Sequence, residues 1–325
     1  MSSIEVFRRL RPRNARCREW ARILPFLVAS PALAQTGLAR AGNACQQTVR
    51  HVAHACQDEA KSDYFLALAK CDNLADGGAR AACRDQAAAD RKDGLSTCAE
   101  SEDARDDVCD RLGGGPYDPV IDPKQFVDAI DNPYMPLVPG TTLVYEGPTA
   151  DGLEHEEFVV THDTRKILGV TCVDVHDLVY VAGDLVEDTH DYHAQDEAGN
   201  VWYFGEVSVQ LENGLVVGTE GSWIAGVDGA KPGIVMEAVN HVGDFYRQEF
   251  ALANAEDQAE VVSLHETVTV PYGGPFHDCI KTRETTPLDL EDVSFKFYCP
   301  GIGEVKTEDA PPGDEHLVLI DVQAN

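Results

Sequence analysis

Two neighbouring segments place histidines and carboxylates at spacings that suit metal binding. They read CVDVHD (172–177) and VEDTHDYHAQD (186–196). Side chains alternate between the faces of a β-strand, so Asp188 and His190 share one face. If the VAGD turn between the segments pairs residues whose numbers sum to 366, His176 lies opposite His190. Two imidazoles and a carboxylate can bind Zn²⁺, and an open coordination position would let the metal activate water for hydrolysis.

This metal site depends on the register of the two strands. A slip by one residue would turn one set of side chains to the opposite face and separate the three groups. Polar alternation on a half-exposed strand also produces such sets without any metal. The sequence therefore allows two interpretations of His176, Asp188 and His190: a metal site or a solvated strand face.

Other catalytic motifs are missing from the sequence. It contains no HExxH, no phosphate-binding glycine loop and no GxSxG, and Ser222 in GTEGSWIAG lacks the spacing of a nucleophile elbow. No EF-hand loop occurs, so Ca²⁺ on acidic loops would serve stability alone. A divalent metal, Zn or Ca, is thus the one cofactor that the sequence suggests.

Six cysteines in residues 42–112 are arranged symmetrically about Gly77 and Gly78. Their numbers pair to one constant sum as Cys45 with Cys109, Cys56 with Cys98, and Cys71 with Cys83. Antiparallel helices over 43–75 and 79–112, with the glycines as the turn, would place each pair at one level and on one narrow face. We predict three disulfides along a helical hairpin, a rigid spacer or docking arm. The alternative is a set of shorter helices with local pairings.

The second half of the chain has the pattern of an antiparallel β-meander. Residues 113–138, with GGGP and two Asp-Pro steps, predict a linker before an acidic β domain over 139–325. The predicted strands are 142–147, 153–162, 170–181, 184–196, 200–207, 244–252, 259–270, 277–285, 293–299 and 316–323. The predicted fold class is α+β: a disulfide-stapled antiparallel helical hairpin followed by a curved antiparallel β-meander, an open barrel or half-barrel.

Three further cysteines belong to the predicted β domain. A hairpin centred near Asp289 places Cys279 opposite Cys299 and predicts a fourth disulfide. Cys172 is then single and is predicted to be a quiet buried thiol. The large packing residues are predicted to be Trp202, Tyr203, Phe204 and Trp223.

The charge of the chain limits its partners. It has 26 Lys and Arg against 56 Asp and Glu, a net charge of −30. Residues 1–34 carry seven Arg and two Glu, so the rest of the chain has a net charge of −35. Such a surface repels nucleic-acid phosphates and anionic lipids and is compatible with cations. We expect an unknown small ligand or protein partner and no nucleic acid.

Residues 1–34 have the pattern of a signal peptide. The basic RRLRPRNARCREWAR precedes the apolar ILPFLVASPA, and Ala32-Leu33-Ala34 fits a signal-peptidase site. The apolar run is too short to span a bilayer, and no later stretch is long and apolar enough. We therefore predict a periplasmic or secreted protein, cleaved near Ala34, in a compartment where disulfides form. The export route, Sec or Tat, stays open.

Four segments of the second half carry a resemblance. They are NPYMPLVPGTTLVYEG (132–147), DEAGNVWYFGE (196–206), GSWIAGVDGAKPGIVM (221–236) and YCPGIGEV (298–305). They resemble signature segments of a group of secreted bacterial proteins without established activity. The resemblance implies an exported β-rich domain, often preceded by a cysteine-bearing helical segment, and it supplies no catalytic residues.

Two functions are compatible with the sequence. The first is an exported binding or interaction protein, in which the β domain holds a ligand and the hairpin serves as a spacer. That function predicts an apolar concave face. The second is a metal-dependent hydrolase that uses His176, His190 and Asp188. The missing catalytic motifs favour the first function.

Overall fold

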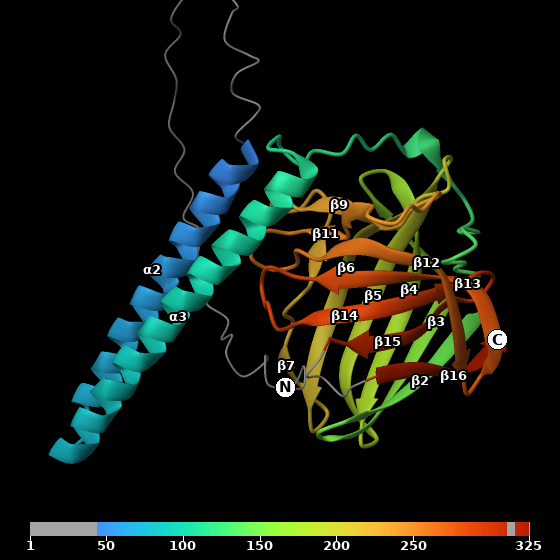
Figure 1. The fold of residues 1–325 in the computed structure, drawn as a ribbon. Helices are drawn as coiled ribbons and strands as arrows, with labels where there is room; N and C mark the ends of the chain where they lie inside the picture. The colour runs from blue at the N-terminus through green and yellow to red at the C-terminus, as the bar shows by residue number, and fades with distance from the viewer. Residues whose placement is uncertain (1–43, 311–315, 325) are drawn as a thin grey trace, which may run out of the picture.

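The computed structural model describes residues 44–310 and 316–324 of the chain. Two long helices lie beside a strongly curved antiparallel sheet (Figure 1). This arrangement confirms the predicted α+β class. The predicted signal peptide, residues 1–34, lies outside the described residues.

The helical hairpin is formed by α2 (Ala44–Asp72) and α3 (Gly77–Leu112). The three predicted disulfides join the helices: Cys45–Cys109, Cys56–Cys98 and Cys71–Cys83, with Cα–Cα distances of 5.7, 5.8 and 5.5 Å. The near-equal distances confirm that each pair lies at one level of an antiparallel pair of helices.

The reversal between the helices differs from the prediction. Gly77 and Gly78 are the first residues of α3 and do not form the turn, which lies just before them. Asp76 caps the helix, because its side chain accepts a hydrogen bond from the backbone N–H of Ala79 at 2.7 Å. This bond satisfies one of the free amides of the first helical turn. The acidic cap, and not glycine flexibility, therefore ends the reversal.

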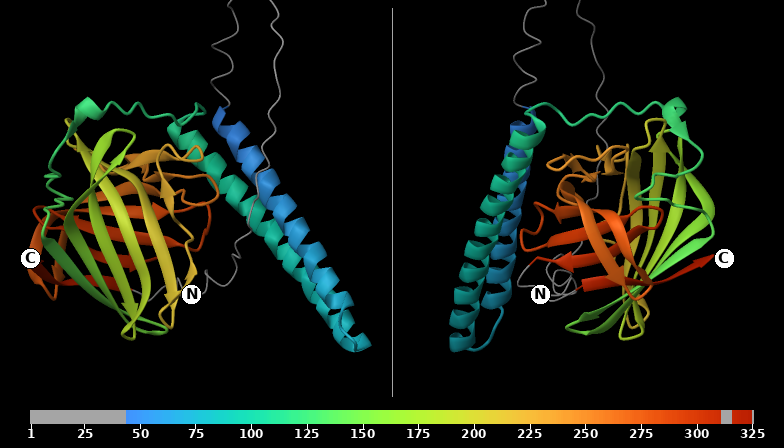
Figure 2. Two further views of the ribbon diagram at one scale, coloured as in Figure 1. Left: turned by 180° about the vertical axis from the view of Figure 1, so that it is seen from behind. Right: turned by 45° about the vertical axis from the view of Figure 1, so that its right-hand side comes forward.

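The β body is one antiparallel sheet of 16 strands. In chain order its elements are η2 (Pro123–Gln125), β1 (Phe126–Val127), β2 (Thr141–Thr149), β3 (Gly152–Ile167), β4 (Val170–Val181), β5 (Asp184–Asp196), β6 (Val201–Glu212), β7 (Leu215–Gly218), β8 (Trp223–Ile224), β9 (Lys231–Met236), β10 (Phe245–Arg247), β11 (Glu249–Phe250), β12 (Gln258–Val270), β13 (Gly273–Thr285), β14 (Val293–Cys299), β15 (Gly303–Asp309) and β16 (His316–Ala324). The long strands β3 to β6 form one wall, and β12 to β16 form the opposite wall (Figure 2).

The sheet closes on itself through one short stretch of chain. Its path runs β10-β12-β13-β14-β15-β16-β2-β3-β4-β5-β6-β9-β11. The two end strands, β10 and β11, are separated in sequence by Gln248 alone. In β9, a Cβ added to Gly233 would lie 2.3 Å from the carbonyl oxygen of Gln248, so only glycine allows this close approach. The body is consequently a nearly closed, barrel-like sheet.

Both registers predicted from turn symmetry are confirmed. His176 pairs with His190 between β4 and β5. The β13–β14 ladder aligns the strands so that Cys279 and Cys299 form a disulfide with a Cα–Cα distance of 4.2 Å. Cys172 is a free, fully buried thiol, and burial raises its pKa to about 12.

The segment predicted as a linker packs along the body. β1 pairs with β5, and Ile130 and Leu137 belong to a buried apolar cluster with Val175 and Ile280. A second cluster contains three of the four predicted packing aromatics, with Trp202 packed against it, and a third surrounds the Cys279–Cys299 bond. Residues 113–138 therefore take part in the core of the body.

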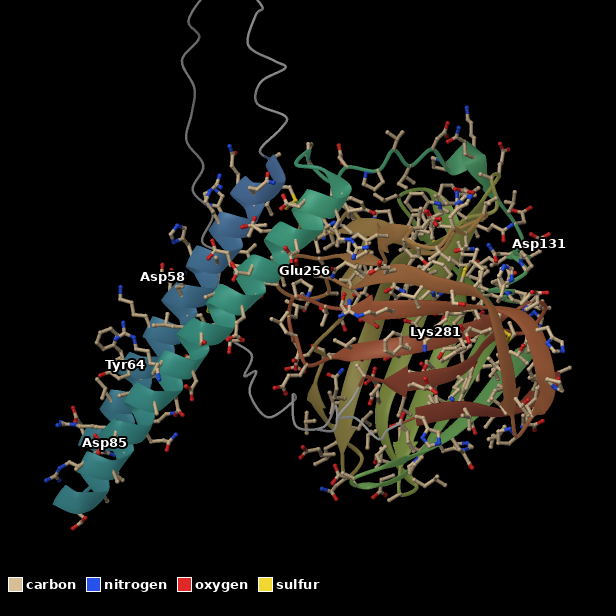
Figure 3. The ribbon with its side chains drawn as sticks, viewed as in Figure 1. Asp58, Tyr64, Asp85, Asp131, Glu256 and Lys281 are labelled. Carbon is tan, nitrogen blue, oxygen red and sulfur yellow. A yellow bond between two sulfur atoms is a disulfide. The ribbon has the colours of Figure 1, made fainter. Side chains whose placement is uncertain are left out.

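The second half of α3 fixes the hairpin to the body. The Arg105 guanidinium lies 2.7 Å from the Glu256 carboxylate, and both side chains are buried. Arg111 lies over the Phe245 ring, 3.7 Å from its centroid. Figure 3 shows Glu256 at this junction and Asp85 near the opposite end of the hairpin, away from the body. The hairpin is thus an arm attached at one end.

Among the described residues, neither helix combines the length and the apolar composition needed to cross a lipid bilayer. The four disulfides are typical of proteins that fold in an oxidising compartment.

Candidate functional site

The β body encloses a cavity of about 340 Å³, which we call the lumen. Seven carboxyl groups from both walls and from the β11–β12 region line it: Glu156, Asp177, Asp191, Glu249, Asp257, Glu284 and Glu304. The rest of the wall includes Tyr145, Tyr203, Tyr298 and Phe158, with Met135 and Leu143 as apolar neighbours. A cavity of this size, with mixed polar and apolar walls, is typical of small-molecule sites.

Positive charge in the lumen wall is scarce. Lys296 on β14 is the one Lys or Arg side chain among the residues that line the cavity. Its Nζ lies 3.5 Å from the Glu284 carboxylate and 3.8 Å from the Glu304 carboxylate. These two neighbours raise the pKa of Lys296 well above its ordinary value, so it stays charged. One cation therefore faces seven carboxyl groups.

Several of the lumen carboxyl groups hold protons unusually strongly. Burial, reinforced by the neighbouring Glu304 carboxylate, raises the pKa of Glu156 to about 8. Burial likewise raises the pKa of Asp191 to about 7 and that of Asp257 to about 6. For Asp177 and Glu249 the pKa lies well above the ordinary value for the same reason. Part of the cluster is consequently protonated at neutral pH.

Tyrosine and histidine side chains organise one side of the lumen. The Tyr203 hydroxyl donates to the Asp191 carboxylate at 2.5 Å and contacts Glu206 at 3.2 Å. The His193 ring stacks on Tyr203 with a centroid distance of 4.7 Å. Burial lowers the pKa of His193 to about 3, so the imidazole is neutral. Nδ1 of His193 and Oδ1 of Asp177 are both buried, and neither atom has a hydrogen-bond partner among the described residues.

The predicted histidine–aspartate group lies on the outer face of the same two strands. His176 Nε2 is 2.9 Å from Asp188 Oδ1, and the His176 and His190 rings stack with centroids 4.3 Å apart. Ligand atoms of these three residues lie within 4.8 Å of one another. The structure therefore brings the predicted residues together, and whether a metal binds them stays a prediction.

The two sites use opposite faces of β4 and β5. His176 and His190 point outward, and the next residues along each strand, Asp177 and Asp191, line the lumen. None of the three predicted ligands belongs to the lumen wall. The alternation of side chains that places the histidines on the outer face thus also places Asp177 and Asp191 in the lumen, which was not predicted.

Sequence reasoning missed the lumen because its carboxyl groups come from strands far apart in the sequence and converge only in the folded sheet. The expectation of an apolar concave face was wrong, since carboxyl groups line the cavity together with aromatic and apolar side chains. The segment HEEFVV did contain a sign of the lumen. Glu156 and Phe158 are two positions apart in β3, so their side chains lie on the same face of the strand, and the face that buries Phe158 also carries Glu156.

Each of the four segments that carry the resemblance contributes to the lumen wall, through Tyr145, Tyr203, Val235 and Tyr298. The resemblance itself stays an expectation. The chain matches no protein-family model, no curated protein and no solved structure. Functional inference therefore depends on the geometry of the two sites.

Proposed function

We propose that the chain is an exported binding protein whose β body holds a small organic cation in the lumen. One observation carries the proposal: seven carboxyl groups and a single lysine surround a cavity of about 340 Å³. The signal peptide over residues 1–34, cleavage near Ala34 and a periplasmic or secreted location belong to the same proposal.

A positively charged ligand fits the energetics of this cavity. Buried carboxylates without cations are unfavourable, and the raised pKa values of Glu156 and Asp257 reflect that cost. A ligand cation would stabilise their charged forms. Aromatic side chains in the wall, such as Phe158, would offer cation–π contacts, which favour quaternary or primary amines.

The volume and the apolar part of the wall favour an organic cation over a bare metal ion. A single metal ion would fill only a small part of the cavity. Met135, Leu143 and Phe158 present apolar surface that matches the carbon skeleton of an amine. The unpartnered His193 Nδ1 adds a site for a ligand hydroxyl or amine.

Isothermal titration with choline, phenethylamine and spermidine tests the proposal. For choline, the uncharged isostere 3,3-dimethylbutan-1-ol is the matched control, because it has the same shape without the charge. We expect at least one amine to bind, and the isostere of choline to bind at least tenfold more weakly than choline. No binding by any amine, or CaCl₂ as the only ligand bound, would contradict the proposal.

Variants connect the binding to the lumen. Replacement of Glu156 by Gln keeps the shape of the side chain and removes its charge, and it should weaken amine binding about tenfold, since a charged hydrogen bond contributes about 1.5–3 kcal/mol. Glu212→Gln, at an exposed position at the end of β6, is the control and should leave binding unchanged.

The metal-dependent hydrolase stays as a second hypothesis. It is favoured by the convergence of His176, Asp188 and His190 on the outer face. Its first requirement is a bound metal ion, which can be tested independently of the lumen.

A further inference from the structure

We infer that the outer face of β4 and β5 binds a divalent transition-metal ion through His176, Asp188 and His190, and that Asp174 is the residue that positions His190. This site is separate from the lumen, and its test does not depend on the proposed binding of an organic cation.

The sheet fixes the two histidines side by side. They are directly opposite in the β4–β5 ladder, and their rings are parallel within 4°. Ligand atoms of His176, Asp188 and His190 lie within 4.8 Å of one another, whereas two ligands on one zinc ion lie about 3.3 Å apart. All three side chains are half-buried, so small rotations of the side chains can close this difference.

Asp174 gives His190 a carboxylate partner that is mostly buried, unlike the more exposed aspartates that contact His241 and His265. Its Oδ1 lies 2.8 Å from Nδ1 of His190, and its side chain is 15% exposed. A proton on Nδ1 donated to this carboxylate leaves the lone pair of His190 on Nε2. Metal-binding histidines usually have such a carboxylate or carbonyl partner, which fixes the tautomer and orients the ring.

The residues directly opposite the pair on the neighbouring strands are apolar. Val159 on β3 lies opposite His176, and Val207 on β6 lies opposite His190. These apolar neighbours offer no competing ligand and no basic group at the same level of the sheet. Asp174 and Asp188 place two carboxyl groups beside the histidine pair, and a divalent cation would complement them.

The ligand types select the class of metal. Imidazole nitrogen suits Zn²⁺, Cu²⁺, Ni²⁺ and Co²⁺, whereas Ca²⁺ prefers six to eight oxygen ligands. Two nitrogens and one carboxylate therefore favour a transition metal over Ca²⁺ at this site. Three protein ligands also leave a coordination position for water or another small molecule.

Titration of the chain from residue 35 onward with ZnSO₄ and CoCl₂ tests the site. We expect one ion per chain and, for Co²⁺, visible absorption bands typical of nitrogen and oxygen ligation. His176→Ala and His190→Ala should each weaken binding at least 100-fold. His241→Ala is the matched control, because the exposed His241 also bonds an aspartate, Asp244 at 3.1 Å.

Asp174→Asn separates positioning from direct ligation. It should weaken Zn²⁺ binding about 10- to 100-fold and shift the Co²⁺ bands at saturation, with circular dichroism and amine binding unchanged. Zn²⁺ binding that is equally tight in His190→Ala, or the lack of any binding at micromolar concentration, would overturn the metal site. Wild-type affinity and bands in Asp174→Asn would overturn the role of Asp174.

Discussion

The helical hairpin and the β body are stabilised by different means. α2 buries little beyond Val49, Ala53 and Cys71, and disulfides take the place of a large apolar core. The body has three apolar clusters and a nearly closed, hydrogen-bonded sheet, and it carries unfavourable carboxyl groups in its interior. The buried carboxyl groups lower the stability of the body, and such a loss of stability is common at functional sites.

Removal of the hairpin disulfides should have the largest effect. Each disulfide typically contributes about 2–4 kcal/mol, so replacement of the six hairpin cysteines by Ala should unfold α2 and α3. Trp202 and Trp223 lie in the body and should keep their near-ultraviolet signal. Circular dichroism measures both changes. Retention of the full helical signal would show that the hairpin has a sufficient core of its own.

The junction between arm and body should be the next most sensitive point. Arg105→Ala leaves the Glu256 carboxylate buried without its cation, which costs about 3–5 kcal/mol. Chemical denaturation should show this loss, and Arg105→Met with Glu256→Met should recover most of it. Arg84→Ala is the control, because both Arg84 and its partner Asp72 are exposed and exposed ion pairs contribute little to stability. Equal losses from both arginines would contradict this difference.

The lumen carboxyl groups should reverse the usual pH dependence of stability. Glu156 binds its proton more strongly in the folded protein, with a pKa of about 8, than in the unfolded chain, where its ordinary value is 4.5. Unfolding therefore releases protons between these values, and stability should fall as the pH rises from 5 to 8. Melting temperatures at the two pH values measure this change.

Glu156→Gln tests which group is responsible. At pH 8 it should stabilise the protein by about 1 kcal/mol or more, since one unit of pKa shift corresponds to about 1.4 kcal/mol. It should also reduce the difference between pH 5 and pH 8, whereas Glu212→Gln should not. A variant that is less stable at pH 8 would indicate that the carboxylate has a structural role.

The smallest effect is expected at Gly94 in α3. The helix passes through this glycine without a break. A Cβ added there would lie 3.5 Å from the Cβ of Ala60, an ordinary contact. Gly94→Ala should therefore stabilise the hairpin by about 1 kcal/mol, the difference in helix propensity, as measured by the denaturation midpoint. Destabilisation would mean that the helices need the glycine for close packing.

The sequence predicted the features that depend on local symmetry. The symmetric positions of the cysteines, together with the helical period, predicted the cysteine pairs. The symmetry of the turns predicted the pairing of His176 with His190 and of the strands that carry Cys279 and Cys299. These features need only the geometry of one hairpin, which is the same wherever the hairpin lies in the fold. The metal-site residues were found for the same reason, and Asp174 was missed because its role depends on the rotamer of His190.

The lumen depends on closure of the whole sheet, which a local pattern does not contain. β9 (KPGIVM) and β15 (GEVKTED) were not predicted as strands, because proline, glycine and charged residues weaken their strand patterns. Both strands have partners on their two sides and complete the ring. A predicted sheet that lacks β9 and β15 is open, and the carboxylates on its inner face are then exposed to water.

The attachment of the arm has a mechanical consequence for the lumen. Glu256 binds Arg105 of α3, and the next residue, Asp257, lines the cavity and accepts hydrogen bonds at its carbonyl from the N–H groups of Gln248 and Glu249. A single peptide bond thus separates the anchor of the arm from a wall residue and from the stretch that closes the ring. Force applied to the far tip of the hairpin would therefore act on the stretch around Gln248, where the two ends of the sheet meet beside the cavity.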